Sequence, residues 1–291
     1  MKLHLIDGTY ELFRSYFGVP KRFSPDGREV GATYGIMAST LSLLAEPGVS
    51  HVAVAFDSVI VSYRNDVYPP YKSGEGIEPD LLSQFPLAEE ALRALGITVW
   101  SMYEYETDDA LATAATRWAD DFDQVVVLSP DKDMAQLYGH PNVVGYDRRK
   151  GAFIDVADVI EKFGVVPESI PDYLALVGDA ADGFPGLPGW GAKSAAAVLG
   201  RYGSLEDIPL EVERWDVKVR GAEKLAATFR THVGDALLYR FLAQLRRDVP
   251  LTETLDDLEW HGVPRETFLA LCEELGFDTL ASRPLRFADS P

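Results

Sequence analysis

The chain has 291 residues, enough for one large domain or two, and 47% of them are hydrophobic, which is ample for a buried core. Its single cysteine, Cys272, excludes a disulfide framework and a thiolate zinc site, and we expect it to be buried. No apolar run reaches the roughly 20 residues that a membrane span needs, and no signal-peptide pattern precedes the first strand, so we expect a cytoplasmic protein with no membrane partner.

The formal net charge of −19, taken alone, argues against nucleic-acid binding, because phosphate contacts come from Lys and Arg. The argument weakens if many acids belong to one metal site. With nine acids assigned to such a site, 37 acidic residues remain against 27 basic ones, and bound divalent ions reduce the difference further. Local basic clusters therefore matter more than the total charge.

Short apolar runs alternate with helical patterns through the first half of the chain. Lys2–Asp7, His51–Asp57, Ile97–Trp100 and Gln124–Leu128 have the pattern of strands, and Thr33–Ala45 has that of a helix. The alternation predicts βαβ units, and hence a mostly parallel α/β sheet with helices on both faces. In such sheets, ligands bind beyond the carboxyl ends of the strands.

Acidic residues follow all four predicted strands. They are Asp7, Asp57, the group Glu106, Asp108 and Asp109, and the pair Asp131 and Asp133. One acid after one strand is common by chance, but four of four is not. Because these strand ends meet at one edge of the sheet, four separate segments are expected to bring carboxylates together.

The acids at 106–109 lie where the third strand gives way to a helix. If this helix starts at Thr107, its apolar stripe runs from Leu111 to Trp118, and Asp108 extends the stripe towards the sheet. A buried carboxylate needs a cation or hydrogen-bond donors, and nothing basic lies nearby in sequence, which favours a metal. The alternative is that these acids only offset the helix macrodipole.

An irregular stretch interrupts the α/β pattern between Ser62 and Ala94. It contains the aromatic and lysine-bearing segment Tyr68–Gly76, followed by a helical pattern that starts at Pro79. Insertions longer than a tight loop are commonly functional. We interpret residues 66–95 as a mobile gateway or arch.

Strand patterns vanish from about Val166 onwards. The division we expect is an α/β domain over residues 1–165, a helical region over 166–255, and a C-terminal helix and tail over 256–291. A glycine-rich turn, Gly186–Ser194, opens a helix inside the helical region, and helix N-termini favour phosphate. Lys193 is disfavoured at a helix start unless it serves an anion, although a tight helix–helix turn is the alternative interpretation.

Seven short motifs occur in an order that defines a known family. They are Leu3-His4-Leu5-Ile6-Asp7-Gly8, Ala55-Phe56-Asp57, Tyr68-Pro69-Pro70-Tyr71-Lys72, Glu106-Thr107-Asp108-Asp109, Asp131-Lys132-Asp133, Gly178-Asp179-Ala180-Ala181-Asp182 and Gly189-Trp190-Gly191-Ala192-Lys193. From Lys2 to about Leu251 the chain resembles the 5′ nucleases, the flap endonucleases and 5′ to 3′ exonucleases that occur as the N-terminal domain of bacterial DNA polymerase I and as free-standing proteins.

The resemblance implies a structure-dependent 5′ nuclease that hydrolyses DNA at 5′ ends and 5′ flaps by a two-metal-ion mechanism. Nine acids would hold two or three ions: Asp7, Asp57, Glu106, Asp108, Asp109, Asp131, Asp133, Asp179 and Asp182. Hard oxygen ligands suit Mg²⁺ or Mn²⁺, and the five histidines show no ligand spacing that would suit zinc.

The resemblance also implies roles for other residues. Arg64 and Lys72 would approach the scissile phosphate, and Phe13 and Arg14 would lie near the cleavage point. A helix-three-turn-helix region would hold the DNA duplex through Gly189, Gly191, Lys193 and Ser194, with K⁺ on main-chain carbonyls of the turn. We expect a monomer of the bacterial intracellular type.

The gateway departs from the family pattern. Glu75 stands where the family usually has arginine, and a second basic position in the following helix is Ser83. With Glu78 and Asp80 close by, the gateway is acidic and should repel a single-stranded 5′ end. The Asp-Asn pair that is common after the last metal acid is Asp182-Gly183 here.

Three other functions compete with this interpretation. A phosphatase of the haloacid dehalogenase class also ends a strand in Asp-Gly-Thr, but its nucleophilic aspartate would stand at Leu5. A PIN-class ribonuclease shares the acid-edged sheet but normally lacks the second helical region. A catalytically weak DNA-structure binder would have little reason to keep nine clustered acids, because they repel one another.

Overall fold

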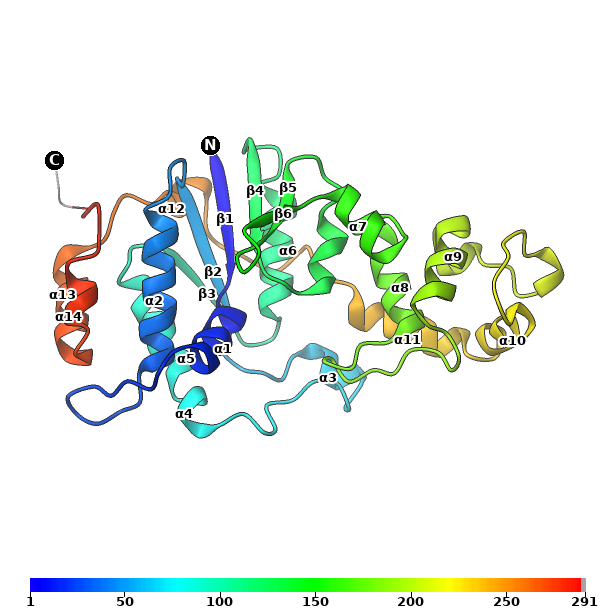
Figure 1. Ribbon diagram of the computed structural model, residues 1–291, viewed down its shortest axis with the longest axis horizontal. Helices are drawn as coiled ribbons and strands as arrows, with labels where there is room; N and C mark the ends of the chain where they lie inside the picture. The colour runs from blue at the N-terminus through cyan, green and yellow to red at the C-terminus, as the bar shows by residue number, and fades with distance from the viewer. Residues whose placement is uncertain (289–291) are drawn as a thin grey trace. The chain divides into compact units, whose positions relative to one another are not determined.

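The computed structural model describes residues 1–288, in which the chain forms two compact units (Figure 1). Unit 1 contains Met1–Ser62, Gly74–Ser129 and Arg247–Pro291, and unit 2 contains Tyr63–Ser73 and Pro130–Arg246. The predicted gateway is thus shared between the units. No helix within residues 1–288 is long and apolar enough to cross a membrane.

Unit 1 is built on four neighbouring parallel strands. They are β1 (Lys2–Asp7), β2 (His51–Asp57), β3 (Thr98–Met102) and β4 (Gln124–Leu128). Their order is β3-β2-β1-β4, with Leu5 of β1 opposite Ala53 on one side and Val127 on the other. The strand predictions are confirmed, with β3 displaced by one or two residues. Every residue of β2 is buried, as expected for a strand covered on both faces.

The strand order determines which face of the sheet each connecting helix covers. They are α1 (Gly8–Gly18), α2 (Gly31–Leu44), α4 (Pro79–Leu82), α5 (Gln84–Arg93) and α6 (Thr107–Arg117). The chain steps from β1 to β2 to β3 in one direction and then returns past β1 to β4. Because parallel crossovers are right-handed, α6 covers the opposite face from α1, α2 and α5. The order reverses between β1 and β4, the place where ligands bind in such sheets.

The C-terminal segment completes unit 1. It contains α12 (Leu255–Leu258), α13 (Arg265–Leu275) and α14 (Asp278–Ala281), where the sequence led us to expect one helix and a tail. The Trp260 amide donates to the Ser50 carbonyl at 2.8 Å, and the Trp260 indole donates to the Leu95 carbonyl at 2.9 Å. Cys272 is buried, as expected. The last three residues of the expected tail, 289–291, lie outside the described residues.

Unit 2 is mainly helical. Its elements are α3 (Tyr63–Val67), η1 (Lys132–Leu137), β5 (Val143–Asp147), β6 (Ala152–Ile154), α7 (Val156–Phe163), η2 (Pro167–Ser169), α8 (Ile170–Val177), α9 (Ala192–Tyr202), η3 (Leu205–Asp207), η4 (Val212–Arg214), α10 (Ala222–Thr231) and α11 (Val233–Ala243). Helix α8 packs against both α9 and α11. The antiparallel pair β5–β6 was not predicted. The helices beyond residue 166 were predicted.

Candidate metal centre and nucleic-acid interface

Asp7 lies where the strand order of unit 1 reverses. It ends β1 and caps α1, because its Oδ1 accepts from the Tyr10 amide at 2.8 Å. Its Oδ2 accepts from the hydroxyl of Ser129, the residue after β4, at 2.8 Å. The side chain is 6% exposed. Donors from the first turn of α1 and from the end of β4 thus fix this carboxylate at the carboxyl edge of the sheet.

Asp57, at the end of β2, is joined to the starts of two helices. Its Oδ1 accepts from the Thr107 amide of α6 at 2.7 Å, and its own amide donates to the Thr9 hydroxyl of α1 at 2.9 Å. A Cβ on Gly8 would lie 2.6 Å from the Ala55 carbonyl oxygen, so only glycine allows α1 to start this close to β2. The Asp7-Gly8-Thr9 sequence therefore has a packing explanation.

Glu106 and Asp109 form the third acidic corner of unit 1. The Ser62 hydroxyl donates to Glu106 Oε1 at 2.6 Å, and the Glu106 amide donates to Asp109 Oδ2 at 3.2 Å. Asp109 is fully buried, whereas Asp108 is half-buried. Asp108 is therefore less deeply buried than Asp109. An acid three residues after the N-cap turns back to the N-cap amide, which draws Asp109 inwards instead.

In unit 2, Asp131 and Asp133 are placed by the start of η1. Asp131 is the N-cap, and its Oδ1 accepts from the Asp133 amide at 2.9 Å. Asp131 is exposed, whereas Asp133 is only 4% exposed. The cap thus turns Asp133 inwards while its neighbour Lys132 is 34% exposed.

Asp179 and Asp182 lie on a tight loop that follows α8. The amides and carbonyls of Asp179 and Phe184 exchange hydrogen bonds of 2.8 and 3.0 Å. Gly178 and Gly186 close the loop, since a Cβ on Gly186 would lie 2.4 Å from the Gly178 nitrogen. Two acids three residues apart are thereby presented on one turn.

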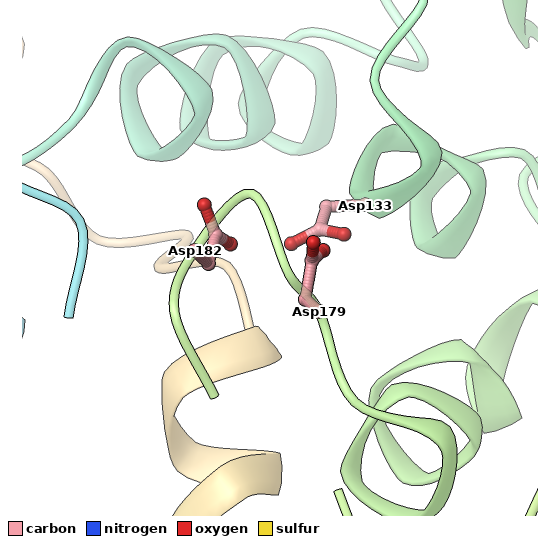
Figure 2. Close-up of side chains that lie close together, drawn as sticks. All are labelled: Asp133, Asp179 and Asp182. Carbon is pink, nitrogen blue, oxygen red and sulfur yellow. The ribbon is translucent and has the colours of Figure 1, made fainter. Parts of the chain in front are cut away.

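Asp133, Asp179 and Asp182 form a three-carboxylate cluster in which one oxygen from each lies within 4.8 Å of the others. Figure 2 shows the Asp133 and Asp179 carboxylates facing one another, with Asp182 across the same loop. Lys132 Nζ lies 2.6 Å from Asp179 Oδ2. The other six predicted acids are not members of this group within residues 1–288.

Asp133 Oδ1 is buried without a hydrogen-bond partner in the described part of the chain. Burial first, and then the charges of Asp131, Asp182 and Asp179, raise the pKa of Asp133 well above its usual range. An unpaired buried carboxylate oxygen inside an all-oxygen donor set is what a hard divalent cation such as Mg²⁺ or Mn²⁺ would satisfy. The residues present therefore fit a divalent-metal site.

Lys72 and Arg64, the two predicted catalytic cations, lie in different surroundings within unit 2. Lys72 is half-buried, and its amide donates to the Asp182 carbonyl at 3.0 Å. A Cβ on Gly183 would lie 2.6 Å from the Pro70 carbonyl oxygen, so glycine is required where the family usually has asparagine. The segment that carries Lys72 is therefore packed directly on the metal-binding loop.

Arg64 is only 1% exposed. Its Nε donates to the Leu242 carbonyl at 2.9 Å and its Nη2 to the Gln244 carbonyl at 3.1 Å, which holds the end of α11. The guanidinium also lies 4.8 Å from the centre of the Tyr63 ring. These contacts give Arg64 a structural part in unit 2, and its catalytic role stays a prediction.

Phe13 and Arg14 lie on α1, and both are half-buried. Phe13 stacks edge-on against Phe85 with ring centres 6.1 Å apart. Arg14 donates to the Ser39 hydroxyl at 2.9 Å and pairs with the buried Glu11. Their predicted place near the cleavage point stays a prediction.

Glu78 and Asp80, two of the acids near the start of α4, have partners within unit 1. Tyr16 donates to Glu78 Oε2 at 2.8 Å, and Lys21 Nζ lies 3.1 Å from Asp80 Oδ2. These contacts tie the start of α4 to α1 and to the segment that follows it. They also reduce the negative charge that Glu78 and Asp80 present to an incoming strand.

The glycine-rich turn opens α9, and its shape is set by Ser194. The Gly191 amide donates to the Ser194 hydroxyl at 3.0 Å, and that hydroxyl donates to the Gly191 carbonyl at 2.9 Å. Gly189 has a φ of 83°, which favours glycine. Trp190 is 7% exposed and packs against Trp215, with ring centres 6.2 Å apart. The turn is thus anchored in the core of unit 2, while Gly189 is exposed and Gly191 is half-buried.

A cavity of about 600 Å³ lies beside this turn. Its walls come from the turn with Lys193, and from a second segment that contributes Lys218 and Arg220. Sequence reasoning missed these last two cations. The alternation Lys218-Val219-Arg220 was a signal, since it exposes both cations on one side of an extended segment.

Comparison with known proteins identifies two family models along the chain. The family model described as the N-terminal resolvase-like domain of 5′-3′ exonuclease matches residues 2–164, and the model described as its C-terminal SAM fold matches residues 165–266. DNA polymerase I of Bacillus caldotenax is 36% identical over 288 residues, covering 97% of this chain and 32% of that protein. DNA polymerase I of Mycobacterium leprae is 36% identical, with 97% and 31% covered. The chain spans about a third of the length of these relatives.

Solved structures share the fold at low identity. The T5 D15 protein co-crystallised with metal ions matches with a TM-score of 0.70 and 18% identity, over 84% of this chain and 89% of that one. Flap endonuclease-1 from Methanococcus jannaschii matches with a TM-score of 0.60 and 16% identity, over 97% and 90%.

A mostly parallel acid-edged sheet with a helical SAM-like part defines the class of this protein as a 5′ nuclease. More particularly, the chain belongs to the 5′-3′ exonuclease family. The predicted fold class and family are confirmed, and this membership removes the phosphatase interpretation.

Proposed function

We propose that the protein hydrolyses phosphodiester bonds of duplex DNA at 5′ ends and 5′ flaps with two or three divalent ions, Mg²⁺ or Mn²⁺. The observation that carries this proposal is the cluster of Asp133, Asp179 and Asp182, with its unpaired buried oxygen on Asp133. When bound, such ions supply charge stabilisation to the phosphodiester transition state and activate the attacking water.

The chain's own residues would hold the ions in place. In unit 1, Asp7, Asp57, Glu106 and Asp109 are held in fixed orientations by neutral donors, which pre-organises them as ligands. In unit 2, Asp131 caps the helix that turns Asp133 inwards. Asp108, on the more exposed side of α6, would complete the set.

Lys72 is our choice for the cation that stabilises the negative charge developing on the phosphate. Its backbone is hydrogen-bonded to the loop that carries Asp182. The segment with Lys72 would therefore be positioned together with this ligand loop. Arg64 would support this arrangement through α11. Phe13 and Arg14 would lie beside the strand that is cut.

Duplex DNA would be held by the turn that opens α9. Gly189 and Gly191 leave space for a phosphate, Ser194 fixes the turn, and Lys193 supplies charge at a cavity that Lys218 and Arg220 also line. Main-chain carbonyls of this turn would bind K⁺. A monomeric state and a cytoplasmic location stay predictions.

The proposal is tested by following cleavage of a 5′-labelled flap and of a blunt duplex while Mg²⁺ or Mn²⁺ is varied. We expect no cleavage in EDTA and recovery with either ion. Metal-dependent cleavage of single-stranded RNA, with no requirement for a duplex, would instead support a PIN-class ribonuclease. Duplex binding without cleavage under any of these conditions would support a DNA-structure binder.

A further inference from the structure

One lysine in unit 2, Lys132, forms an ion pair with a predicted metal ligand, Asp179. Lys132 Nζ lies 2.6 Å from Asp179 Oδ2, and Asp179 is one corner of the three-carboxylate cluster. The pair is unequal in burial, because the lysine side chain is 34% exposed and the aspartate side chain is 4% exposed. The lysine can therefore move towards solvent, whereas Asp179 is fixed by its loop.

The aspartate is held independently of the lysine. Asp179 Oδ1 accepts from the Ala181 amide at 3.0 Å, and its main chain is bonded to Phe184 in both directions. Losing Lys132 would therefore leave the orientation of Asp179 intact. What the ammonium adds is charge, in a place where three carboxylates repel one another.

A divalent ion and an ammonium on the same carboxylate repel each other. Asp179 Oδ2 lies at salt-bridge distance from Lys132, so an ion bound through that oxygen must displace the lysine or share the oxygen with it at a cost. We propose that Lys132 is a built-in substitute cation: it neutralises the cluster in the metal-free protein and is displaced from Asp179 when a divalent ion binds. This inference rests on the proposed metal site.

The proposal has a quantitative consequence. If only the fraction of molecules with Lys132 released can bind the ion, the apparent dissociation constant is the intrinsic one divided by that fraction. Lys132 would then weaken apparent metal affinity while stabilising the metal-free fold. A lysine that merely supported Asp179 would have the opposite effect on affinity, since its removal would loosen a ligand.

The test measures metal occupancy rather than activity. Full-length protein is titrated with Mn²⁺, and free Mn²⁺ is followed by its electron paramagnetic resonance signal. We expect Lys132→Met, which keeps the aliphatic stem and removes the charge, to lower the apparent dissociation constant of the Asp179-dependent site three- to tenfold. The same variant should melt at a lower temperature in EDTA and gain more from Mn²⁺ than the wild type does.

The matched control is Lys150→Met. Lys150 also pairs with an aspartate in unit 2, at 3.5 Å from Asp147 Oδ2, and Asp147 is not one of the nine acids. This control removes the same charge, so its Mn²⁺ affinity should stay within twofold of wild type. Lys132→Arg should behave as wild type, and Lys132→Gln replaces Lys132→Met if the latter does not fold.

Unchanged or weaker Mn²⁺ binding in Lys132→Met would overturn the proposal. Asp179→Asn separates this failure from failure of the metal site itself. If Asp179→Asn leaves Mn²⁺ binding unaltered, the site is wrongly assigned. If it abolishes one site while Lys132→Met leaves that site's affinity unchanged, only the role of Lys132 is wrong. The double variant, Lys132→Met with Asp179→Asn, should bind Mn²⁺ as Asp179→Asn alone does.

Discussion

The two units hold their predicted metal ligands in different ways. In unit 1, Asp7, Asp57 and Glu106 accept hydrogen bonds from neutral groups that include two serine hydroxyls and two backbone amides. In unit 2, Asp179 is paired with an ammonium, and Asp133 Oδ1 is buried with no hydrogen-bond partner among residues 1–288. Acids held by neutral donors add to the stability of the fold, whereas clustered buried acids reduce it until a cation binds.

The largest effect should come from removing a ligand in either unit. We expect Asp109→Ala, Asp131→Ala and Asp179→Ala each to lower flap cleavage by roughly 10³-fold, because each change removes a proposed metal ligand from the reaction. Single-turnover rates measure the loss. Duplex affinity in Ca²⁺ should change little, and activity within tenfold of wild type would remove that residue from the ligand set.

A buried base in unit 1 should give the fold a pH dependence. Burial, and then the charge of Lys2, lower the pKa of His4 to about 4 from its ordinary 6.5. A lowered pKa means that its stabilising contribution is complete above pH 6.5 and is lost as the pH falls towards 4. The loss should reach up to about 3 kcal/mol. Urea denaturation in EDTA should show this slope in the wild type, with a flatter slope in His4→Leu.

The comparison between the units predicts stability changes of opposite sign. Asp57→Ala in unit 1 should destabilise the metal-free protein by about 1 to 2 kcal/mol, since it leaves the Thr107 amide without its acceptor. Asp133→Asn in unit 2 should stabilise it by about 1 kcal/mol, since it removes a buried charge from a repulsive cluster. Urea denaturation in EDTA measures both, and destabilisation by Asp133→Asn would break the comparison.

Charge at the α9 turn should matter for binding rather than for chemistry. Lys193→Ala should weaken duplex binding about uniformly across sequences and reduce the slope of log K against log[salt] by about 1, and Lys218→Ala should do the same. Lys150→Ala is the control, with an unchanged slope. Binding titrations at several salt concentrations decide this, and wild-type slopes in both variants would make the turn only a structural corner.

The gateway should give the smallest effect. Glu75 stands where the family usually has arginine, so its substitution tests the departure of the gateway from the family pattern directly. Glu75→Arg should lower KM for flapped substrates several-fold, more at low salt than at high, with less change in kcat. A flap and a blunt duplex are compared at two salt concentrations. An unmoved KM at low salt would mean that the strand does not pass Glu75.

The sequence predicted those features that are encoded locally. Asp7 and Asp57 were found because each ends a short apolar run, and such runs are readable without tertiary information. Asp179 and Asp182 follow no strand, and their place depends on the close approach of Gly178 and Gly186, so only the family resemblance pointed to them.

Other features were beyond local patterns. The β5–β6 pair includes a strand of only three residues, too short to show a period. The inward turn of Asp109 depends on a hydrogen bond to the Glu106 amide, and an extrapolated helical stripe does not contain it. Lys218 and Lys193 line one cavity although 24 intervening residues separate them, so their common use depends on the fold of unit 2.

The most direct test of the account is the rate of flap cleavage by wild type and Asp179→Asn in EDTA, Mg²⁺ and Mn²⁺. We predict metal-dependent release of the 5′ strand by the wild type, and a loss of roughly 10³-fold in the variant at equal duplex affinity. Cleavage by the wild type in EDTA, or wild-type rates in Asp179→Asn, would contradict the proposed metal-dependent 5′ nuclease.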